Sequence, residues 1–335
     1  MKKAILISIS IICVICIGTY LFFFRNNIKN DATLYIPTNA TYQQVLDSLE
    51  KNNVLINKSA FEKIAKQLDY PTLVKAGRYV LEKPMSNFEL VKKLRSGNQD
   101  ALKITINNVK NLTHLAAKLG AKLEPDSASF YQTFIQQNIL DSLQLNQDNI
   151  LTIFLANTYQ FYWNTSTDEF LARMLKEYSR FWNDDRKNKA EKLGLSPTEV
   201  TILASIVQKE SSKYDEYARI AGVYYNRLKK NMKLQADPTV LYAKQKLGLS
   251  NRVYNKDTKI EHPYNTYYVL GLPPGPICLP ETKSIDLCLD LEHHDYIFFC
   301  AKDDFSGYHS FAADWATHEK NAEKFHQALN ANNIK

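Results

Sequence analysis

Cysteine, glycine and proline are all scarce in this chain, and their scarcity excludes a disulfide scaffold and a flexible stalk. Two of the five cysteines, Cys13 and Cys16, lie in an apolar N-terminal stretch, so only Cys278, Cys288 and Cys300 remain elsewhere. Three cysteines permit at most one internal bridge, which excludes a disulfide scaffold. With 10 glycines, 11 prolines and no low-complexity stretch, the chain is predicted to be globular and not a flexible stalk.

Motifs for metal and nucleotide chemistry are missing too. The seven histidines show no HExxH or other metal-ligand spacing, so no metal site is predicted. There is no GxSxG, P-loop or dinucleotide fingerprint, and no cofactor is expected. The net charge of +7 is spread out, which suits an anionic envelope polymer, a lipid surface or simple solubility. Without a basic-aromatic run, nucleic acid is not an expected partner.

One long apolar run is present, at the N-terminus. Residues 4–24 carry no charge, and a helix of this length crosses a hydrocarbon core of roughly 30 Å. A cleavable signal peptide has a shorter run and a small-x-small exit, whereas this run ends in aromatic residues and Arg25. We therefore predict a cytoplasmic tail (1–3), a single transmembrane helix (4–24) in the plasma membrane, a short spacer (25–33), and the remaining chain outside.

Residues 32–101 are predicted to form a compact βααβ unit followed by a further helix. The elements are expected at residues 34–37 (strand), from the Thr41-x-x-Gln44 capping box (helix), near 60–68 (helix), at 77–81 (strand) and from the Ser86-x-x-Glu89 capping box (helix). Gly97 is expected to end the last helix.

The next stretch is mainly helical in pattern. A strand is expected at 102–106, helices at 112–119 and 130–140, a helical repeat of core residues at Phe170, Met174, Tyr178 and Phe181, and a turn or linker at 183–189. Because helical patterns dominate and no regular βαβ alternation appears, the fold class is predicted to be α+β.

Glu210 is the first candidate for chemistry. A helix is expected from Ser196-Pro-Thr-Glu199, and Glu210 falls on its apolar stripe, three residues after Val207. Gln208 and Lys209 lie off this stripe. A carboxyl group at the end of a buried face is desolvated, which raises its pKa toward that of a general acid. The alternative is a structural ion pair with Arg219 or Arg227.

Several short motifs follow in a distinctive order. They are NRL (226–228), LQADPTVLYA (234–243), PYNTY (263–267), GLPPGPI (271–277) and GYHSF (307–311). In this order and spacing they resemble the MltG (YceG-like) family of membrane-anchored endolytic murein transglycosylases, over the whole chain and most closely at 203–277. The resemblance implies a LysM-like unit at 32–101, a catalytic domain at 102–335, and Glu210 at the position of the family's catalytic glutamate.

The resemblance also implies a set of substrate-binding side chains. They are Asn226, Gln235, Asp237, Tyr264, Asn265 and Tyr267. Amides suit sugar hydroxyls and N-acetyl groups, and tyrosines stack on sugar rings, but internal hydrogen bonding or core packing stays open for each amide and tyrosine. Asp237 is also explained as a helix N-cap before Pro238. His309 matches a family position, and we expect it to be buried and hydrogen-bonded.

Three segments depart from the family pattern. Residues 106–109 read Ile-Asn-Asn-Val where the family usually has Ile-Pro-Glu-Gly, and residues 156–159 read Ala-Asn-Thr-Tyr in place of Pro-Asp-Thr-Tyr. Thr317 stands where an acidic residue is common. These segments lie outside the central motifs, so they affect details of the substrate groove and not the reaction.

By resemblance, the chain is a lyase that cuts the MurNAc-GlcNAc bond of nascent peptidoglycan strands in cell wall assembly, leaving 1,6-anhydro-MurNAc ends. Its expected partners are glycan strands and the membrane, with peptidoglycan synthases as further candidates. One carboxyl group suffices for this reaction, acting first as acid and then as base. Two alternatives remain: a hydrolytic muramidase with Asp237 as nucleophile or base, and a non-catalytic peptidoglycan-binding scaffold.

Overall fold

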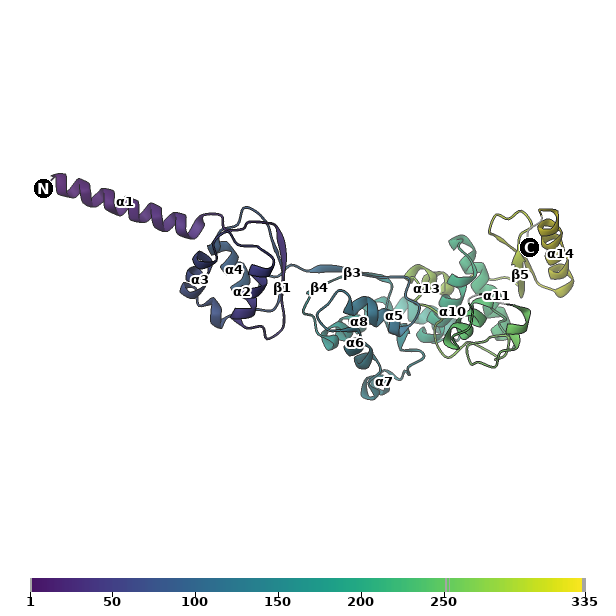
Figure 1. Ribbon diagram of the computed structural model, residues 1–335. Helices are drawn as coiled ribbons and strands as arrows, with labels where there is room; N and C mark the ends of the chain where they lie inside the picture. The colour runs from purple at the N-terminus through teal and green to yellow at the C-terminus, as the bar shows by residue number, and fades with distance from the viewer. Residues whose placement is uncertain (1, 251, 253, 333–335) are drawn as a thin grey trace. The chain divides into compact units, whose positions relative to one another are not determined.

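The computed structural model describes residues 2–250, 252 and 254–332, and the chain divides into two compact units (Figure 1). Unit 1 runs through Ile104 and takes in residues 122–125 and 160–166. Unit 2 contains residues 105–121, 126–159 and the chain from Thr167 onward.

Unit 1 begins with the apolar helix α1 (Lys2–Phe24). Residues 6–24 have a mean hydropathy of 2.5, and none of this stretch is buried against the protein. The helix is therefore long and apolar enough to cross a membrane, which is compatible with a single-pass anchor or a signal sequence.

The body of unit 1 has the predicted order of elements. Strands β1 (Ala32–Ile36) and β2 (Gly77–Leu81) pair antiparallel, and the helices are α2 (Tyr42–Lys51), α3 (Lys58–Gln67) and α4 (Asn87–Ser96). Both predicted capping boxes are formed, at Thr41 and Ser86, and Gly97 ends α4 in the left-handed region at φ 73°. The resemblance of this unit to LysM stays a prediction.

The expected spacer at 25–33 is wrong in its central part. Ile28 is fully buried in the core of unit 1. The Asn27 side-chain amide donates to Asn87 Oδ1 at 2.6 Å and to the Asn57 carbonyl at 2.9 Å. An apolar side chain and a buried amide thus fix this segment to the unit, because leaving either in solvent would forfeit burial and hydrogen bonds.

Unit 2 is mainly helical. Its helices are α5 (Leu112–Gly120), α6 (Ser127–Phe134), α7 (Gln137–Leu143), α8 (Thr167–Phe181), α9 (Asp184–Lys192), α10 (Pro197–Glu210), α11 (Tyr217–Lys229), α12 (Asp237–Lys246), α13 (Thr282–Leu289) and α14 (Trp315–Ala331). Strands β5 (Phe298–Ala301) and β6 (His309–Ala312) pair antiparallel. A further two-stranded sheet joins β3 (Leu102–Ile106) and β4 (Asn157–Phe161), and the unit boundaries given above fall within both strands. The α+β class is confirmed, whereas the predicted domain boundaries stay predictions.

Two local predictions in unit 2 are wrong. The stretch 183–189, expected to be a turn or linker, begins helix α9, where Asn183 Oδ1 accepts from the Arg186 backbone N–H at 3.0 Å. Its cap and its acidic first turn favour a helix although it has almost no apolar stripe. The single helix expected at 130–140 is interrupted at Ile135 and Gln136, which lie between α6 and α7.

Helix α10 forms the centre of the unit 2 core. Every side chain from Val200 to Val207 is buried, because α10 packs with α11, α12 and α13. The burial covers the whole circumference of the helix and not only the predicted stripe. At its C-terminal end the helix emerges from the core in its last three residues, Gln208, Lys209 and Glu210. The candidate site therefore lies at the C-terminal end of α10.

Candidate functional site

Glu210 is the last residue of α10 and is partly buried. Its Oε1 accepts a hydrogen bond from the Tyr224 hydroxyl on α11 at 2.5 Å. Desolvation raises the pKa of Glu210 to about 7, and the Asp237 charge acts in the same direction, whereas the Tyr224 hydrogen bond and the Arg227 charge lower it. A carboxyl group with this pKa donates a proton and takes one back near neutral pH.

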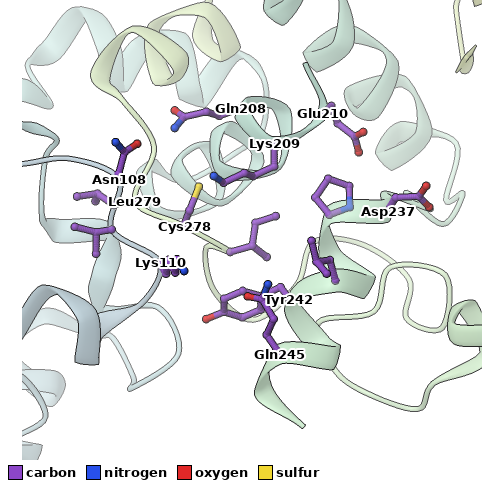
Figure 2. A pocket seen from close by; sticks show the side chains of 14 residues that line it. Asn108, Lys110, Gln208, Lys209, Glu210, Asp237, Tyr242, Gln245, Cys278 and Leu279 are labelled. Atoms are coloured by element: carbon purple, nitrogen blue, oxygen red, sulfur yellow. The ribbon is translucent and has the colours of Figure 1, made fainter. Parts of the chain in front are cut away.

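Glu210 lines a cavity of about 530 Å³ within unit 2 (Figure 2). This volume lies within the range of small-ligand sites. The lining side chains come from α10, α12, the loop before α5 and the loop before α13: Asn108, Val109, Lys110, Gln208, Lys209, Glu210, Asp237, Pro238, Leu241, Tyr242, Gln245, Ile277, Cys278 and Leu279.

Asp237 joins Glu210 at one end of this cavity (Figure 2). The N-cap of α12 is Ala236, and Asp237 is the first helical residue, with no side-chain capping bond. The N-cap alternative for Asp237 is therefore wrong. Its Oδ1 instead accepts a hydrogen bond from the Tyr267 hydroxyl at 2.7 Å. Tyr267 thus reaches the site through Asp237, although it does not line the cavity.

The structural ion pair offered as the alternative role of Glu210 is also wrong. Arg219 pairs with Glu292, with 3.0 Å between Nε and Oε2. Arg227 is buried and donates to backbone carbonyls, at 2.7 Å to Leu234 and 2.6 Å to Ile297. Within the described chain, neither arginine forms an ion pair with Glu210. Arg227 therefore acts on Glu210 only through its charge.

Two of the predicted substrate-binding amides, Asn226 and Gln235, are not among the residues that line the cavity. Asn226 donates through Nδ2 to the carbonyls of His294 at 2.6 Å and Tyr296 at 3.0 Å. Gln235 is exposed, with φ 52°, and its Oε1 accepts from Arg227 Nη1 at 3.3 Å. Asn226 therefore takes the internal role left open for it, while Gln235 is exposed and bonded to Arg227 through Oε1.

Tyr264 and Asn265 serve the interior of the protein. Tyr264 is 2% exposed, and its hydroxyl donates to Asp148 Oδ1 at 3.2 Å. Asn265 is 0% exposed and donates to the carbonyls of Thr258 at 3.1 Å and Ile260 at 2.8 Å. This geometry does not support direct substrate contact by either residue, because burial leaves neither a surface for a sugar ring.

His309 has the predicted character. Its Nδ1 lies 2.9 Å from Glu216 Oε2, and its backbone N–H donates to Glu216 Oε1 at 2.8 Å. Both side chains are mostly buried. The pair joins β6 to the segment before α11 and does not line the cavity.

Several residues of the site escaped the sequence prediction. Tyr224 was missed, although it lies one turn before Arg227 on the buried face of α11, a spacing that points both side chains the same way. Gln208 and Lys209 were placed off the stripe of α10, yet both line the cavity because the helix ends there. The departure at 106–109 also reaches the site, since Asn108 and Val109 line the cavity.

The chain is similar to known proteins along most of its length. The endolytic murein transglycosylase of Bacillus subtilis (strain 168) is 30% identical over 318 residues, which are 90% of this chain and 87% of that protein. The enzyme of the same name from Streptococcus pneumoniae (serotype 2, strain D39) is also 30% identical, over 91% of this chain. This chain spans only 60% of the length of the pneumococcal protein.

A solved structure supports the same relationship. The crystal structure of a YceG-like protein from Listeria monocytogenes is 28% identical, with a TM-score of 0.58, over 87% of this chain and 99% of that one. The profile of the YceG-like family matches residues 34–324. The motifs, the relatives and the profile agree, and the chain belongs to the YceG-like family.

Proposed function

We propose that this chain is a membrane-anchored endolytic murein transglycosylase with Glu210 as its catalytic group. The observation that carries the proposal is Glu210 itself, whose pKa of about 7 results from burial at the edge of an open cavity. Relatives that are 30% identical over about nine-tenths of the chain carry the name endolytic murein transglycosylase, which makes the chain a lyase of the lytic transglycosylase type.

The proposed reaction uses one carboxyl group twice. Protonated Glu210 donates to the glycosidic oxygen between MurNAc and GlcNAc, and that bond breaks. The resulting carboxylate takes the proton from the 6-hydroxyl of the same MurNAc, whose oxygen bonds to the anomeric carbon and closes a 1,6-anhydro ring. No water is consumed, and Glu210 ends protonated as it began. The Tyr224 hydrogen bond to Oε1 holds the carboxyl group in one orientation during both steps.

A hydrolytic muramidase remains the second candidate, because Asp237 lines the same cavity as Glu210. In that reaction Asp237 would be the nucleophile or the base for water. In the transglycosylase, Asp237 has a different role: its negative charge raises the pKa of Glu210 and so keeps the acid protonated at neutral pH.

The remaining parts of the proposal concern location. We propose that α1 is a single-pass anchor with Lys2 and Lys3 in the cytoplasm and the cavity outside the membrane. The βααβ order of unit 1 supports a LysM-like role in binding glycan. Nascent strands close to the membrane are then the substrate, and peptidoglycan synthases are the candidate partners.

Product analysis tests the proposal against both rivals. The fragment from Asn26 onward is incubated with purified glycan strands, and the products are separated and weighed by mass spectrometry. Products from internal cuts with 1,6-anhydro ends, lighter by one water than reducing ends, are expected. Reducing ends would establish the muramidase instead, and intact strands would favour the non-catalytic scaffold.

A further inference from the structure

Two lysines of the cavity have no part in the proposed reaction. Lys110 lies in the loop between β3 and α5, and Lys209 is the penultimate residue of α10. Both are exposed and both line the cavity (Figure 2). Among residues that the structure describes, neither ammonium group forms an ion pair. Two cations without a protein carboxylate therefore border the cavity that holds Glu210.

The charges of the cavity are divided between its two ends. Glu210 and Asp237 lie at one end, Lys110 lies at the other, and Lys209 lies between (Figure 2). The Lys209 charge is close enough to the buried Cys278 to act on its thiol. An anion between Lys110 and Lys209 would thus meet two positive charges on the side of the cavity away from the carboxyl pair (Figure 2).

The lining strengthens this preference for an anion. Leu241, Ile277 and Leu279 line the cavity with apolar groups, and a low-dielectric wall increases the attraction between unlike charges. The end of α10 is also held in place: Gln208 Oε1 accepts from the Glu281 backbone N–H at 2.7 Å and from Ser284 Oγ at 2.8 Å. Lys209 therefore extends from a fixed backbone.

We propose that Lys110 and Lys209 bind carboxylates of the peptide carried by MurNAc, so that the enzyme favours peptide-bearing over peptide-free glycan strands. This inference rests on the proposed function. The peptide is attached to the muramic acid whose anomeric carbon forms the scissile bond next to Glu210. The first carboxylates of the peptide are therefore carried by the reacting sugar itself. One cavity then accommodates both the reacting sugar and its anionic substituent.

The test compares two substrates made from one preparation of uncrosslinked strands. One keeps its peptides, the other has had them removed enzymatically, and both are stripped of phosphate-bearing polymers so that peptide is the source of any anion. The full chain in detergent is assayed for kcat/KM by release of 1,6-anhydro ends. The wild type should favour the peptide-bearing strands. The double variant Lys110→Gln, Lys209→Gln should lower that ratio roughly tenfold.

Matched variants separate charge from folding. Lys187→Gln removes one positive charge from the exposed surface of α9, outside the cavity, and should keep the wild-type ratio. Lys110→Arg, Lys209→Arg keeps both charges and should also keep the preference. Raising the salt concentration should lower the wild-type ratio toward that of the glutamine variant. Both kcat/KM values in the ratio are measured on the same protein preparation. Partial unfolding lowers both values equally and therefore leaves the ratio unchanged.

The outcomes keep the two proposals apart. Equal cleavage of both substrates by the wild type, or an unchanged ratio in the glutamine double variant, overturns the lysine proposal and leaves the transglycosylase intact. A wild-type protein that releases no 1,6-anhydro ends from either substrate overturns the proposed function itself.

Discussion

Each unit carries a glutamate at a helix end, and the two have opposite surroundings. Glu89 lies in the first turn of α4 in unit 1, where it accepts a 2.8 Å hydrogen bond from the Ser86 backbone N–H, and this bond lowers its pKa. Glu210 is the last residue of α10 in unit 2, where burial raises its pKa to about 7. The same side chain completes a helix cap in one unit, and in the other its pKa is raised into the range that the proposed proton transfer requires.

The comparison sets a carboxylate that stabilises a helix against one whose surroundings disfavour its charge. A negative charge at a helix N-terminus is favoured by the helix dipole, whereas at a C-terminus it is disfavoured. The charge of Glu89 therefore stabilises unit 1, while the charge of Glu210 opposes folding of unit 2. A fold that retains such a destabilised group is the common signature of a functional site.

The largest expected effect comes from removing the proton of Glu210. Glu210→Gln should leave the protein folded and lower the rate of 1,6-anhydro release by about 10²–10⁴-fold, the usual range for a lost general acid and base. The matched variant Glu89→Gln should leave the rate unchanged, because Glu89 is not among the described residues that line the cavity. Unchanged turnover in Glu210→Gln would falsify the catalytic assignment.

Removing the Tyr224 hydroxyl should have a smaller effect and shift the pH profile. Its hydrogen bond stabilises the charged form of Glu210 and lowers the pKa, so Tyr224→Phe should raise it. The wild-type rate should decline as pH rises through about 7, where Glu210 loses its proton. In the variant this decline should move to higher pH, with a roughly tenfold lower rate from the poorer orientation of the carboxyl group. A shift to lower pH would contradict this arrangement.

Asp237 discriminates between the two candidate reactions. In the transglycosylase, its charge only raises the pKa of Glu210, so Asp237→Asn should lower that pKa and cost a few-fold in rate at neutral pH. In a muramidase, loss of the nucleophile or base would cost roughly 10²-fold or more. The rate at several pH values, together with the product masses, decides between them.

The two glutamates should also affect stability with opposite signs. The pKa of Glu210 rises from an ordinary 4.5 to about 7 on folding, so the wild type loses stability as pH rises across this interval. Glu210→Gln should therefore be more stable than the wild type at pH 8, by roughly 1–3 kcal/mol, with the difference vanishing below about pH 4.

Glu89 provides the reverse case. Its pKa is lowered on folding, so its stabilising effect is present above the unfolded pKa and is lost as pH falls. Glu89→Gln should be less stable than the wild type at pH 8 and should approach it in acid. Urea midpoints of both variants at several pH values measure the two trends. If both variants changed in stability in the same direction with pH, the two glutamates would not have opposite effects on folding.

Much of unit 1 could be predicted from sequence because its signals are local. The Thr41 and Ser86 capping boxes and Gly97 act within one helical turn, and each is formed as expected. The segment at Asn27 and Ile28 was mistaken for a spacer because its partners lie far along the chain. Polar residues such as Asn27 have the composition of a linker, and only the tertiary structure shows the buried group that they bind.

In the candidate site, the sequence led to Glu210 because its position on α10 combines helical spacing with a family motif, and its catalytic role stays a proposal. Asn265 could not be separated from a sugar-binding amide, because its burial depends on the carbonyls of Thr258 and Ile260 in another turn of the loop. Tyr224, fourteen residues after Glu210, depends on the packing of α11 against α10, which the sequence does not specify.

The smallest expected effect on catalysis comes from removing α1. Deleting residues 1–25 should leave the rate of glycan cleavage in solution unchanged within about twofold, while the protein leaves the membrane fraction. The cut preserves Asn27 and Ile28, which are buried in unit 1, and removes the partly buried Phe23 together with the ring contacts of Phe23 and Phe24 with Phe88. Deleting residues 1–28 is the matched control, since it also removes a fully buried Ile and the Asn27 hydrogen bonds. That variant should lose several kcal/mol of stability in unit 1, visible as an earlier unfolding step.

If the shorter deletion instead aggregates or still binds detergent, α1 is not a separable anchor. If it stays soluble but loses its activity on isolated strands, unit 1 and its helix contribute to catalysis, and the contrast drawn between the two glutamates does not extend to the units that carry them.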